Sequence, residues 1–196
     1  MNEADLRSRL PIDNLGRRLF FYETTDSTNA RALASLEDGS AEDGDLHLAL
    51  EQTAGRGCRG RDWHSPAGAG LWFSLVRLQE PPSPVSFWPG LALKRTLNAW
   101  EVESWIKWPN DLIVADRKIA GILVEAPIRG TTPQGWVIGV GVNLEQMAFP
   151  PELADLATTV HRESGVTAPA AAVRGSLLSR TTVIYRQRLH GPDPVR

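Results

Sequence analysis

The chain reads LHLALEQTAGRGCRGRDWHSPAGAGLWFSLVRL from residue 46 to residue 78, and this stretch carries its strongest structural signal. Apolar and polar residues alternate over Leu46–Gln52, which is the pattern of a β-strand with one buried face. Gly70–Leu78 is mostly apolar and predicts a second strand. Between them, Thr53–Ala69 is a long loop rich in glycine and arginine, which we call the Gly/Arg loop. Long loops of this kind inside compact domains are usually functional.

The centre of this loop, GRGCRGR at residues 55–61, is predicted to close over an anionic small molecule. Its glycines allow unusual backbone angles and a close approach to a ligand. Its arginines, Arg56, Arg59 and Arg61, carry planar forks of donors that match carboxylate or phosphate oxygens. A soluble enzyme or ligand-binding domain is therefore expected. The alternatives are an RG-rich segment that binds nucleic acid and a solvated loop.

Strands and helices are predicted on both sides of the loop. The further strands are Leu19–Tyr22, Ser104–Trp108, Asp111–Val114, Lys118–Glu125 and Trp136–Asn143, and the helices are Asn29–Leu36, Val85–Trp100 and Ala170–Leu189. Strands grouped around a few helices imply an α+β (mixed α/β) fold, with a central mixed β-sheet and flanking helices. Residues 1–18 are expected to form a frayed or loosely docked N-terminal arm, and residues 19–196 one domain.

Composition and charge limit the class of protein. The chain has 196 residues and a formal net charge of −2, which argues against a nucleic-acid-binding protein that depends on a basic surplus. Cys58 is its one cysteine, so an intrachain disulfide is excluded. The charged N-terminus has no signal-peptide core, and no apolar run of about 18 residues follows. We therefore expect a cytoplasmic location and no membrane segment.

The segment KWPNDLIVADRK at residues 107–118 offers a second set of functional groups. If Asp111–Lys118 is a tight hairpin, a carboxylate and an amine lie near its open end. A buried lysine can stabilise negative charge on a carbonyl or phosphoryl oxygen, and a carboxylate can orient or deprotonate an attacking amine. The alternative is a surface hairpin with a solvated charge pair.

Two further segments have both a structural and a functional interpretation. Gly139 and Gly141 precede Asn143 at a strand end, which indicates either a close approach by a ligand or another backbone, or a strand with a bulge. Thr25–Asn29 is explained by helix capping, or by small polar groups that recognise a neutral head such as a ureido ring. The four histidines show no metal-ligand spacing, so no protein metal site is predicted.

Taken in order, these segments resemble the catalytic domain of the biotin–protein ligases, also called biotin–[acetyl-CoA-carboxylase] ligases. The resemblance rests on TTDSTNARA at 24–32, EQTAGRGCRGRDWHSPAGAGLWFSL at 51–75, KWPNDLIVADRKIAGILVE at 107–125 and IGVGVNL at 138–144. It implies the biotin/lipoate ligase fold, which is similar to that of class II aminoacyl-tRNA synthetases. It also implies a reaction in two steps, in which biotin and Mg-ATP give biotinyl-5'-adenylate, which then acylates one lysine of a biotin carboxyl carrier domain.

The resemblance implies a role for each matching position. Lys118, Asp111 and Arg56 are the implied catalytic residues: Lys118 for the activated carbonyl and phosphate, Asp111 for the incoming carrier lysine, Arg56 for the carboxylate or phosphate. The implied biotin site comprises Ser27, Thr28, Asn29, Gln52, Arg56, Gly57, Cys58 and Lys118. The implied ATP and adenylate site comprises Arg56, Gly57, Arg59, Arg61, Trp63, Lys118 and Asn143, with Mg²⁺ held mainly through ATP.

The sequence differs from the usual family pattern at three places. The family usually reads GRGRxGR, and Cys58 replaces its second arginine, which helps to hold the adenylate. No winged helix–turn–helix precedes the domain, so we expect no repressor role and no DNA partner. The chain stops at HGPDPVR, where the family commonly continues into a small SH3-like domain. The expected partner is a biotin carboxyl carrier protein such as that of acetyl-CoA carboxylase, and relatives suggest a possible homodimer.

Three alternatives to an active biotin ligase remain open. One is a related acyltransferase for lipoate or octanoate, with a longer and purely apolar acyl slot. Another is a non-catalytic module that binds biotin or its adenylate. The third is a nucleic-acid binder, which salt-dependent DNA binding would reveal.

Overall fold

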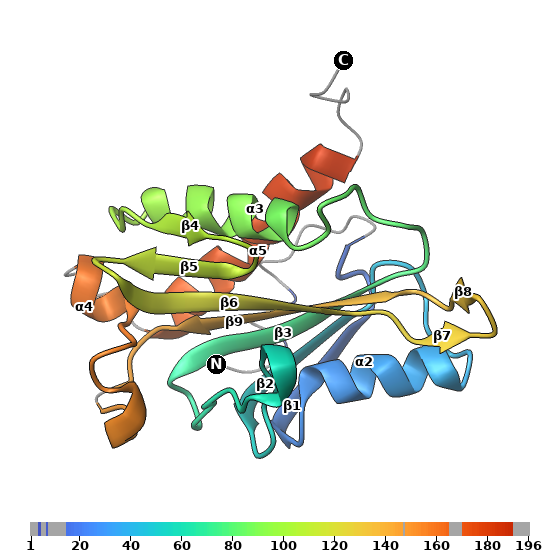
Figure 1. Ribbon diagram of the computed structural model, residues 1–196, viewed down its shortest axis with the longest axis horizontal. Helices are drawn as coiled ribbons and strands as arrows, with labels where there is room; N and C mark the ends of the chain where they lie inside the picture. Colours follow the sequence, from blue (N-terminus) through green and yellow to red (C-terminus); the bar gives the residue numbers. More distant parts are fainter. Residues whose placement is uncertain (1–3, 5–6, 8–14, 147, 165–169, 190–196) are drawn as a thin grey trace.

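The computed structural model describes residues 4, 7, 15–146, 148–164 and 170–189. This part of the chain folds around a seven-stranded sheet in the order β1-β2-β3-β9-β6-β5-β4 (Figure 1). Its strands are β1 (Leu19–Thr25), β2 (Leu46–Gln52), β3 (Gly70–Arg77), β4 (Trp105–Lys107), β5 (Asp111–Val114), β6 (Arg117–Glu125) and β9 (Trp136–Asn143). β1 and β2 are parallel and the other neighbours are antiparallel, so the predicted mixed sheet is confirmed.

Helices cover both faces of this sheet (Figure 1). On one face, α2 (Thr28–Glu37) packs Ala32 and Leu36 against Val76 and Val137. On the other face, α3 (Phe87–Asn98) and α5 (Ala170–Leu189) enclose the larger core. The two clusters draw on alternate residues of β3, because successive side chains of a strand point to opposite faces.

The predicted elements agree with the structure apart from their ends. Leu46–Gln52, Asp111–Val114 and Trp136–Asn143 have the predicted bounds, whereas β1 continues to Thr25 because it pairs with β2 as far as Gln52. Sequence reasoning missed five short elements: β7 (Ile128–Arg129), β8 (Thr132–Pro133), α4 (Val160–Ser164) and two 3₁₀ turns, at Cys58–Gly60 and Pro151–Leu153. Each is too short to show a hydrophobic period.

Residues 15–18 of the predicted arm are docked on the domain. Leu15 is buried in the main core, and the Arg18 guanidinium lies 3.1 Å from the carboxylate of the buried Asp45. The rest of the arm, apart from residues 4 and 7, lies outside the described residues.

The β5–β6 hairpin contains the feature that positions Lys118. Ala115 and Asp116 both have positive φ, 46° and 64°, which is the geometry of a tight two-residue hairpin turn. Leu112 lies opposite Ala120 but Ile113 lies opposite Lys118, so Ile119 is an extra residue. This bulge turns Ile119 and Ala120 to the core and leaves Lys118 on the same side as Asp111.

Candidate active site

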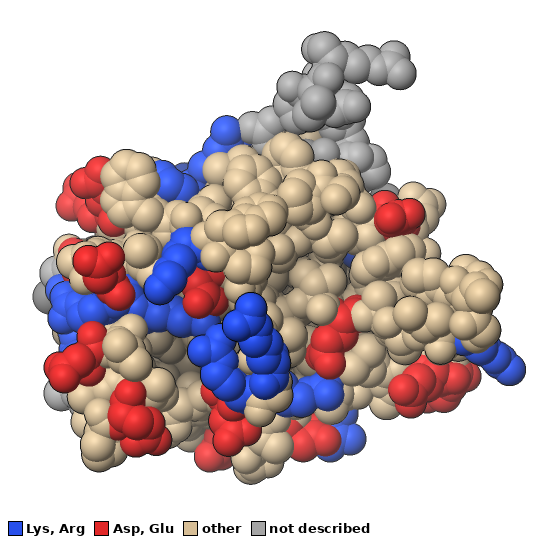
Figure 2. Space-filling model, in the orientation of Figure 1, with Lys and Arg blue, Asp and Glu red and all other residues tan. Residues whose placement is uncertain are grey.

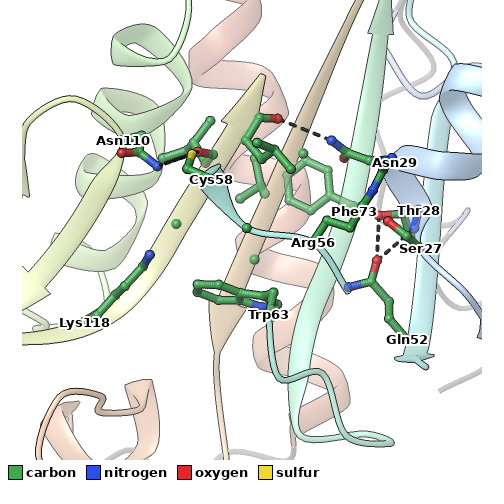
Figure 3. Close-up of a pocket in the computed structure, with 17 residues that line it drawn as sticks. Ser27, Thr28, Asn29, Gln52, Arg56, Cys58, Trp63, Phe73, Asn110 and Lys118 are labelled. Carbon is green, nitrogen blue, oxygen red and sulfur yellow. Dashed lines mark hydrogen bonds between the residues drawn. The ribbon is translucent and has the colours of Figure 1, made fainter. Parts of the chain in front are cut away.

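A polar pocket lies where the start of α2 meets β3, β6, β9 and the Gly/Arg loop (Figure 3). We call it the α2 pocket, and it contains about 420 Å³ of space not filled by atoms. Its lining includes eight of the residues that the sequence implicated: Ser27, Thr28, Asn29, Gln52, Arg56, Gly57, Cys58 and Lys118. These come from three separate sequence segments, so the structure brings together the whole set implied for biotin.

Hydrogen bonds fix the polar side chains at one end of the α2 pocket. Gln52 Oε1 accepts a hydrogen bond from the Thr28 N–H at 2.8 Å and lies 3.1 Å from the Thr28 hydroxyl (Figure 3). The Gln52 amide in turn donates to Ser65 Oγ at 2.9 Å, and Ser65 donates to the Trp63 carbonyl at 3.0 Å. Gln52 therefore joins helix α2 to the far end of the Gly/Arg loop.

A second set of bonds runs from the sheet to the near end of the loop. Ser74, fully buried on β3, lies 2.7 Å from Thr28 Oγ1 and donates to Asn29 Oδ1 at 2.5 Å. The Asn29 amide donates to Glu125 Oε2 at 2.7 Å, and the Arg56 guanidinium lies 3.3 Å from the same oxygen. Ser74 and Glu125 were not among the predicted site residues. Ser74 could have been found in the sequence, because it carries the single hydroxyl in the apolar run GLWFSLVR.

Side chains at the start of α2 line the α2 pocket, and in the described part of the chain the N-cap side chain does not cap the helix. Ser27 occupies the N-cap position, but its side chain makes no capping hydrogen bond among the described residues and lines the α2 pocket instead. Partial burial opposes ionisation of Asp26, but hydrogen bonds from the Ser27 N–H and the Thr25 hydroxyl and the charge of Arg31 together lower the pKa of Asp26. Capping by Ser27 therefore does not explain this segment, contrary to one interpretation of the sequence.

Glycines form the floor of the site. A Cβ on Gly139 would lie 2.8 Å from Asn29 Cγ, and one on Gly141 would lie 2.5 Å from Trp63 Cε2. Gly121, opposite Gly141 in the sheet, also faces Trp63 and the Lys118 side chain. The close approach predicted from the glycines is thus made by side chains rather than by a second backbone.

The Gly/Arg loop forms an irregular hairpin over this floor. The Gly57 N–H donates to the Arg61 carbonyl at 2.6 Å, and the Trp63 N–H donates to the Gly55 carbonyl at 2.9 Å. Between these bonds a short 3₁₀ turn spans Cys58–Gly60. The Cys58 sulfur points into the α2 pocket, 3.0 Å from the Asn110 amide nitrogen (Figure 3). The small Cys58 side chain therefore fits beneath the loop, against the Asn110 amide.

Lys118 lies at the centre of the site. Its ammonium is 2.7 Å from Asp111 Oδ1 and 4.9 Å from the centre of the Trp63 ring. The ion pair is close but poorly aligned, so the buried Asp111 Oδ1 accepts no hydrogen bond of good geometry among the described residues. The Lys118 backbone pairs with Leu156 and Thr158. The predicted proximity of the carboxylate and the amine is thus observed, and the bulge produces it.

A second pocket lies on the other side of Lys118, beneath the tip of the Gly/Arg loop, and we call it the loop pocket. It contains about 1020 Å³ of space not filled by atoms, part of it open to solvent. It shares Gly57, Cys58, Trp63 and Lys118 with the α2 pocket. Arg61, Asp111 and Asn143 also line it, whereas Arg59 is exposed and lines neither pocket. One wall is apolar and was missed by sequence reasoning: Phe149, Leu153, Leu156 and Ala157.

Charge and metal-ligating groups limit what these pockets hold. Figure 2 shows Lys and Arg side chains gathered over the middle of one face, with Asp and Glu around them. Within the described ranges, no three His, Cys, Asp or Glu side chains lie together as a metal site would require. No helix in the part of the chain that the structure describes has the length and apolarity to cross a membrane.

Comparison with known proteins identifies the family. The sequence profile of the biotin/lipoate A/B protein ligase family matches residues 21–143, so the chain belongs to that family. It is 32% identical over its whole length to a Bacillus spizizenii protein named bifunctional ligase/repressor BirA, of which it spans 62%. It is 35% identical to a Mycobacterium tuberculosis biotin–[acetyl-CoA-carboxylase] ligase, over 86% of this chain and 64% of that protein.

Solved structures agree with this assignment. The fold is similar to that of a biotin protein ligase from Aquifex aeolicus in complex with biotin and ATP, with a TM-score of 0.73 and 28% sequence identity. The match covers 88% of this chain and 72% of that one. The resemblance and the fold class predicted from the sequence are therefore confirmed.

Proposed function

We propose that this chain joins biotin to a lysine of a biotin carboxyl carrier domain, such as that of acetyl-CoA carboxylase, at the expense of ATP. The observation that carries the proposal is the shared wall of the two pockets, because Lys118 and Trp63 line both. A ligand carboxylate that reaches this wall from the α2 pocket would meet a phosphate that reaches it from the loop pocket. The name of the Mycobacterium relative and the ligands of the Aquifex structure support this assignment.

The α2 pocket suits the polar head of biotin. Ser27, Thr28, Asn29 and Gln52 offer the hydroxyl and amide groups that a ureido ring requires, since its carbonyl accepts hydrogen bonds and its N–H groups donate them. A purely apolar slot, as expected for a lipoate or octanoate transferase, would not present these groups. Labelled biotin that enters a carrier domain, when lipoate does not, would separate the two acyl donors.

The loop pocket suits ATP. Arg61 and Lys118 can contact phosphate oxygens, and the wall that contains Phe149 and Leu153 is apolar enough for a nucleobase. The Trp63 indole N–H is buried and has no hydrogen-bond partner among the described residues, so it can donate to an oxygen of the ligand. The described residues provide no acidic cluster for a resident Mg²⁺, so we expect the ion to enter with ATP.

In the first step, a biotin carboxylate oxygen attacks the α-phosphorus of ATP and pyrophosphate leaves. In the second step, the amine of the carrier lysine attacks the carbonyl carbon of the adenylate, AMP leaves and the amine loses a proton. Lys118 is placed to stabilise the charge that develops on carbonyl and phosphoryl oxygens. The Asp111 carboxylate, which lines the loop pocket beside Lys118, would accept a hydrogen bond from the incoming amine.

The test is to mix the protein with biotin, Mg-ATP and an apo carrier domain, and to seek the mass increase of one biotin on one lysine. Lys118→Ala should abolish that increase and the biotin-dependent exchange of ATP with pyrophosphate. Lys94→Ala is the matched control, because Lys94 lies on α3 beside Trp105 and lines neither pocket. Retained activity in Lys118→Ala would refute the role of Lys118.

The same mixture tests the alternative of a non-catalytic module. Biotin binding measured by calorimetry, together with no exchange of ATP with pyrophosphate, would support that module. The chain spans 62% of the length of its Bacillus relative. The ligase activity is therefore a proposal for the 196 residues of this chain. A homodimer, a cytoplasmic location and the absence of a DNA partner also remain predictions.

A further inference from the structure

The two sets of hydrogen bonds around the α2 pocket form one continuous chain that ties both ends of the Gly/Arg loop to the body of the protein. One end of the chain is Ser65, which Gln52 holds, and the other is Arg56, which Glu125 holds. Thr28, Ser74 and Asn29 connect the two ends through distances of 2.5 to 3.1 Å. We call Ser27, Thr28, Asn29 and Gln52 the polar head site. A displacement of these side chains therefore affects the Gly/Arg loop at both of its ends.

Glu125 is the member of this chain that joins the body of the protein to Arg56. It is the last residue of β6, and its Oε2 lies 2.7 Å from Asn29 Nδ2 and 3.3 Å from Arg56 Nη2. Asn29 is 4% exposed and is fixed from below by Ser74 and the Gly139 floor, so its amide hydrogen aims at Glu125 from a rigid position. Arg56, by contrast, has a side chain that is 41% exposed and belongs to the loop.

We propose that Glu125 is a positioning residue that latches the Gly/Arg loop against the polar head site, through its charge on Arg56. The latch lowers the entropic cost of ordering the loop when a ligand binds. It also aligns Arg56 beside Asn29 before the ligand carboxylate arrives. The identity of that ligand rests on the proposed function, but the latch itself does not.

Glu125→Gln separates the charge from the shape of this residue. A glutamine oxygen can still accept the hydrogen bond from Asn29, but the ion pair with Arg56 is lost. Glu51→Gln is the matched control, because Glu51, the penultimate residue of β2, is also a glutamate that accepts a hydrogen bond, from Thr24, and no contact between its side chain and the loop is seen among the described residues. Equal melting temperatures would show that both variants are folded.

The first experiment is limited digestion with trypsin without added ligand, followed by mass spectrometry of the cuts after Arg56, Arg59 and Arg61. Loop cleavage should be about three- to fivefold faster in Glu125→Gln, as expected for loss of a partly exposed ion pair, and unchanged in Glu51→Gln. In an Arg56→Ala background, cleavage at the two remaining arginines should rise similarly, and adding Glu125→Gln should change it no further. Unchanged cleavage in Glu125→Gln, or an additive effect in the double variant, would overturn the latch.

The second experiment measures biotin affinity and turnover. Glu125→Gln should raise the KM for biotin about three- to fivefold while kcat stays within about twofold, because the ion pair orders the loop and touches no reacting atom. A loss of kcat without a change in KM would contradict a positioning role. If the protein uses no biotin at all, the proposed function fails, and the digestion experiment still decides whether the latch exists.

Discussion

Replacing Gly139 with alanine is expected to destabilise the protein and to weaken its binding of biotin. The new methyl group would lie 2.8 Å from Asn29 Cγ and closer still to its carbonyl oxygen, so the Asn29 side chain has to move. That movement breaks a buried hydrogen bond with Ser74 and a charge-assisted one with Glu125.

The cost can be worked out from these two bonds. A neutral hydrogen bond contributes about 1 kcal/mol and one to a charged group about 1.5 to 3 kcal/mol. Alanine restricts the unfolded chain and returns up to about 1 kcal/mol. The free energy of unfolding should therefore fall by about 1.5 to 4 kcal/mol, which lowers the melting temperature by roughly 3 to 16 °C for a domain of this size.

Urea unfolding followed by tryptophan fluorescence measures this change. Gly90→Ala is the control, because its methyl group would lie 3.5 Å from Ile122 Cδ1, an ordinary contact, on helix α3. That variant should be neutral or up to about 1 kcal/mol more stable, since alanine is the better helix former. If Gly139→Ala unfolds within about 0.5 kcal/mol of the wild type, the close packing of Asn29 on the glycine floor is not energetically important.

Three other predictions concern separate features. Cys58→Arg restores the family's usual arginine and should slow release of the adenylate in a chase experiment; an unchanged release rate would show that Arg59 or Arg61 already retains it. Burial, aided by Arg18, lowers the pKa of His47 to about 4. Because the unfolded histidine takes up a proton near pH 6.5, the wild type should lose about 2 kcal/mol more stability between pH 7 and pH 5 than His47→Gln; parallel pH profiles would exclude this linkage. Gly141→Ala should displace Trp63 from the wall between the two pockets and lower activity by at least about tenfold; a fully active variant would show that this wall tolerates movement.

The sequence predicted the sheet and the grouping of its functional segments because these depend on local patterns. Alternation over Leu46–Gln52 and the glycine-rich run before Asn143 can be recognised without any tertiary information. The presence of a tight turn between β5 and β6 also followed from a short connection between two strand-like segments. What the sequence predicted best, therefore, was each segment by itself.

Contacts between segments were harder to predict. The ion pair of Lys118 with Asp111 depends on the extra residue Ile119, and strand patterns do not show a bulge. Glu125 ended a predicted strand like many exposed glutamates, and only the register of β6 with β9 places it beside the start of α2. Leu153 and its neighbours lie in a segment without a motif, so no local signal marked them as a pocket wall.

The arrangement of charges explains why two pockets have to act together. The resemblance assigned two cations to biotin, Arg56 and Lys118, and each lies beside a carboxylate, that of Glu125 or Asp111. At Lys118 an anionic ligand therefore competes with the Asp111 carboxylate, and a single carboxylate group gains little from that exchange, whereas Glu125 holds Arg56 in place for the ligand. A ligand that also fills the polar head site gains the hydrogen bonds offered there, and one that carries a phosphate gains the Arg61 side of the loop pocket. Selectivity thus comes from contacts beyond the anion, since the cations alone would accept any small acid.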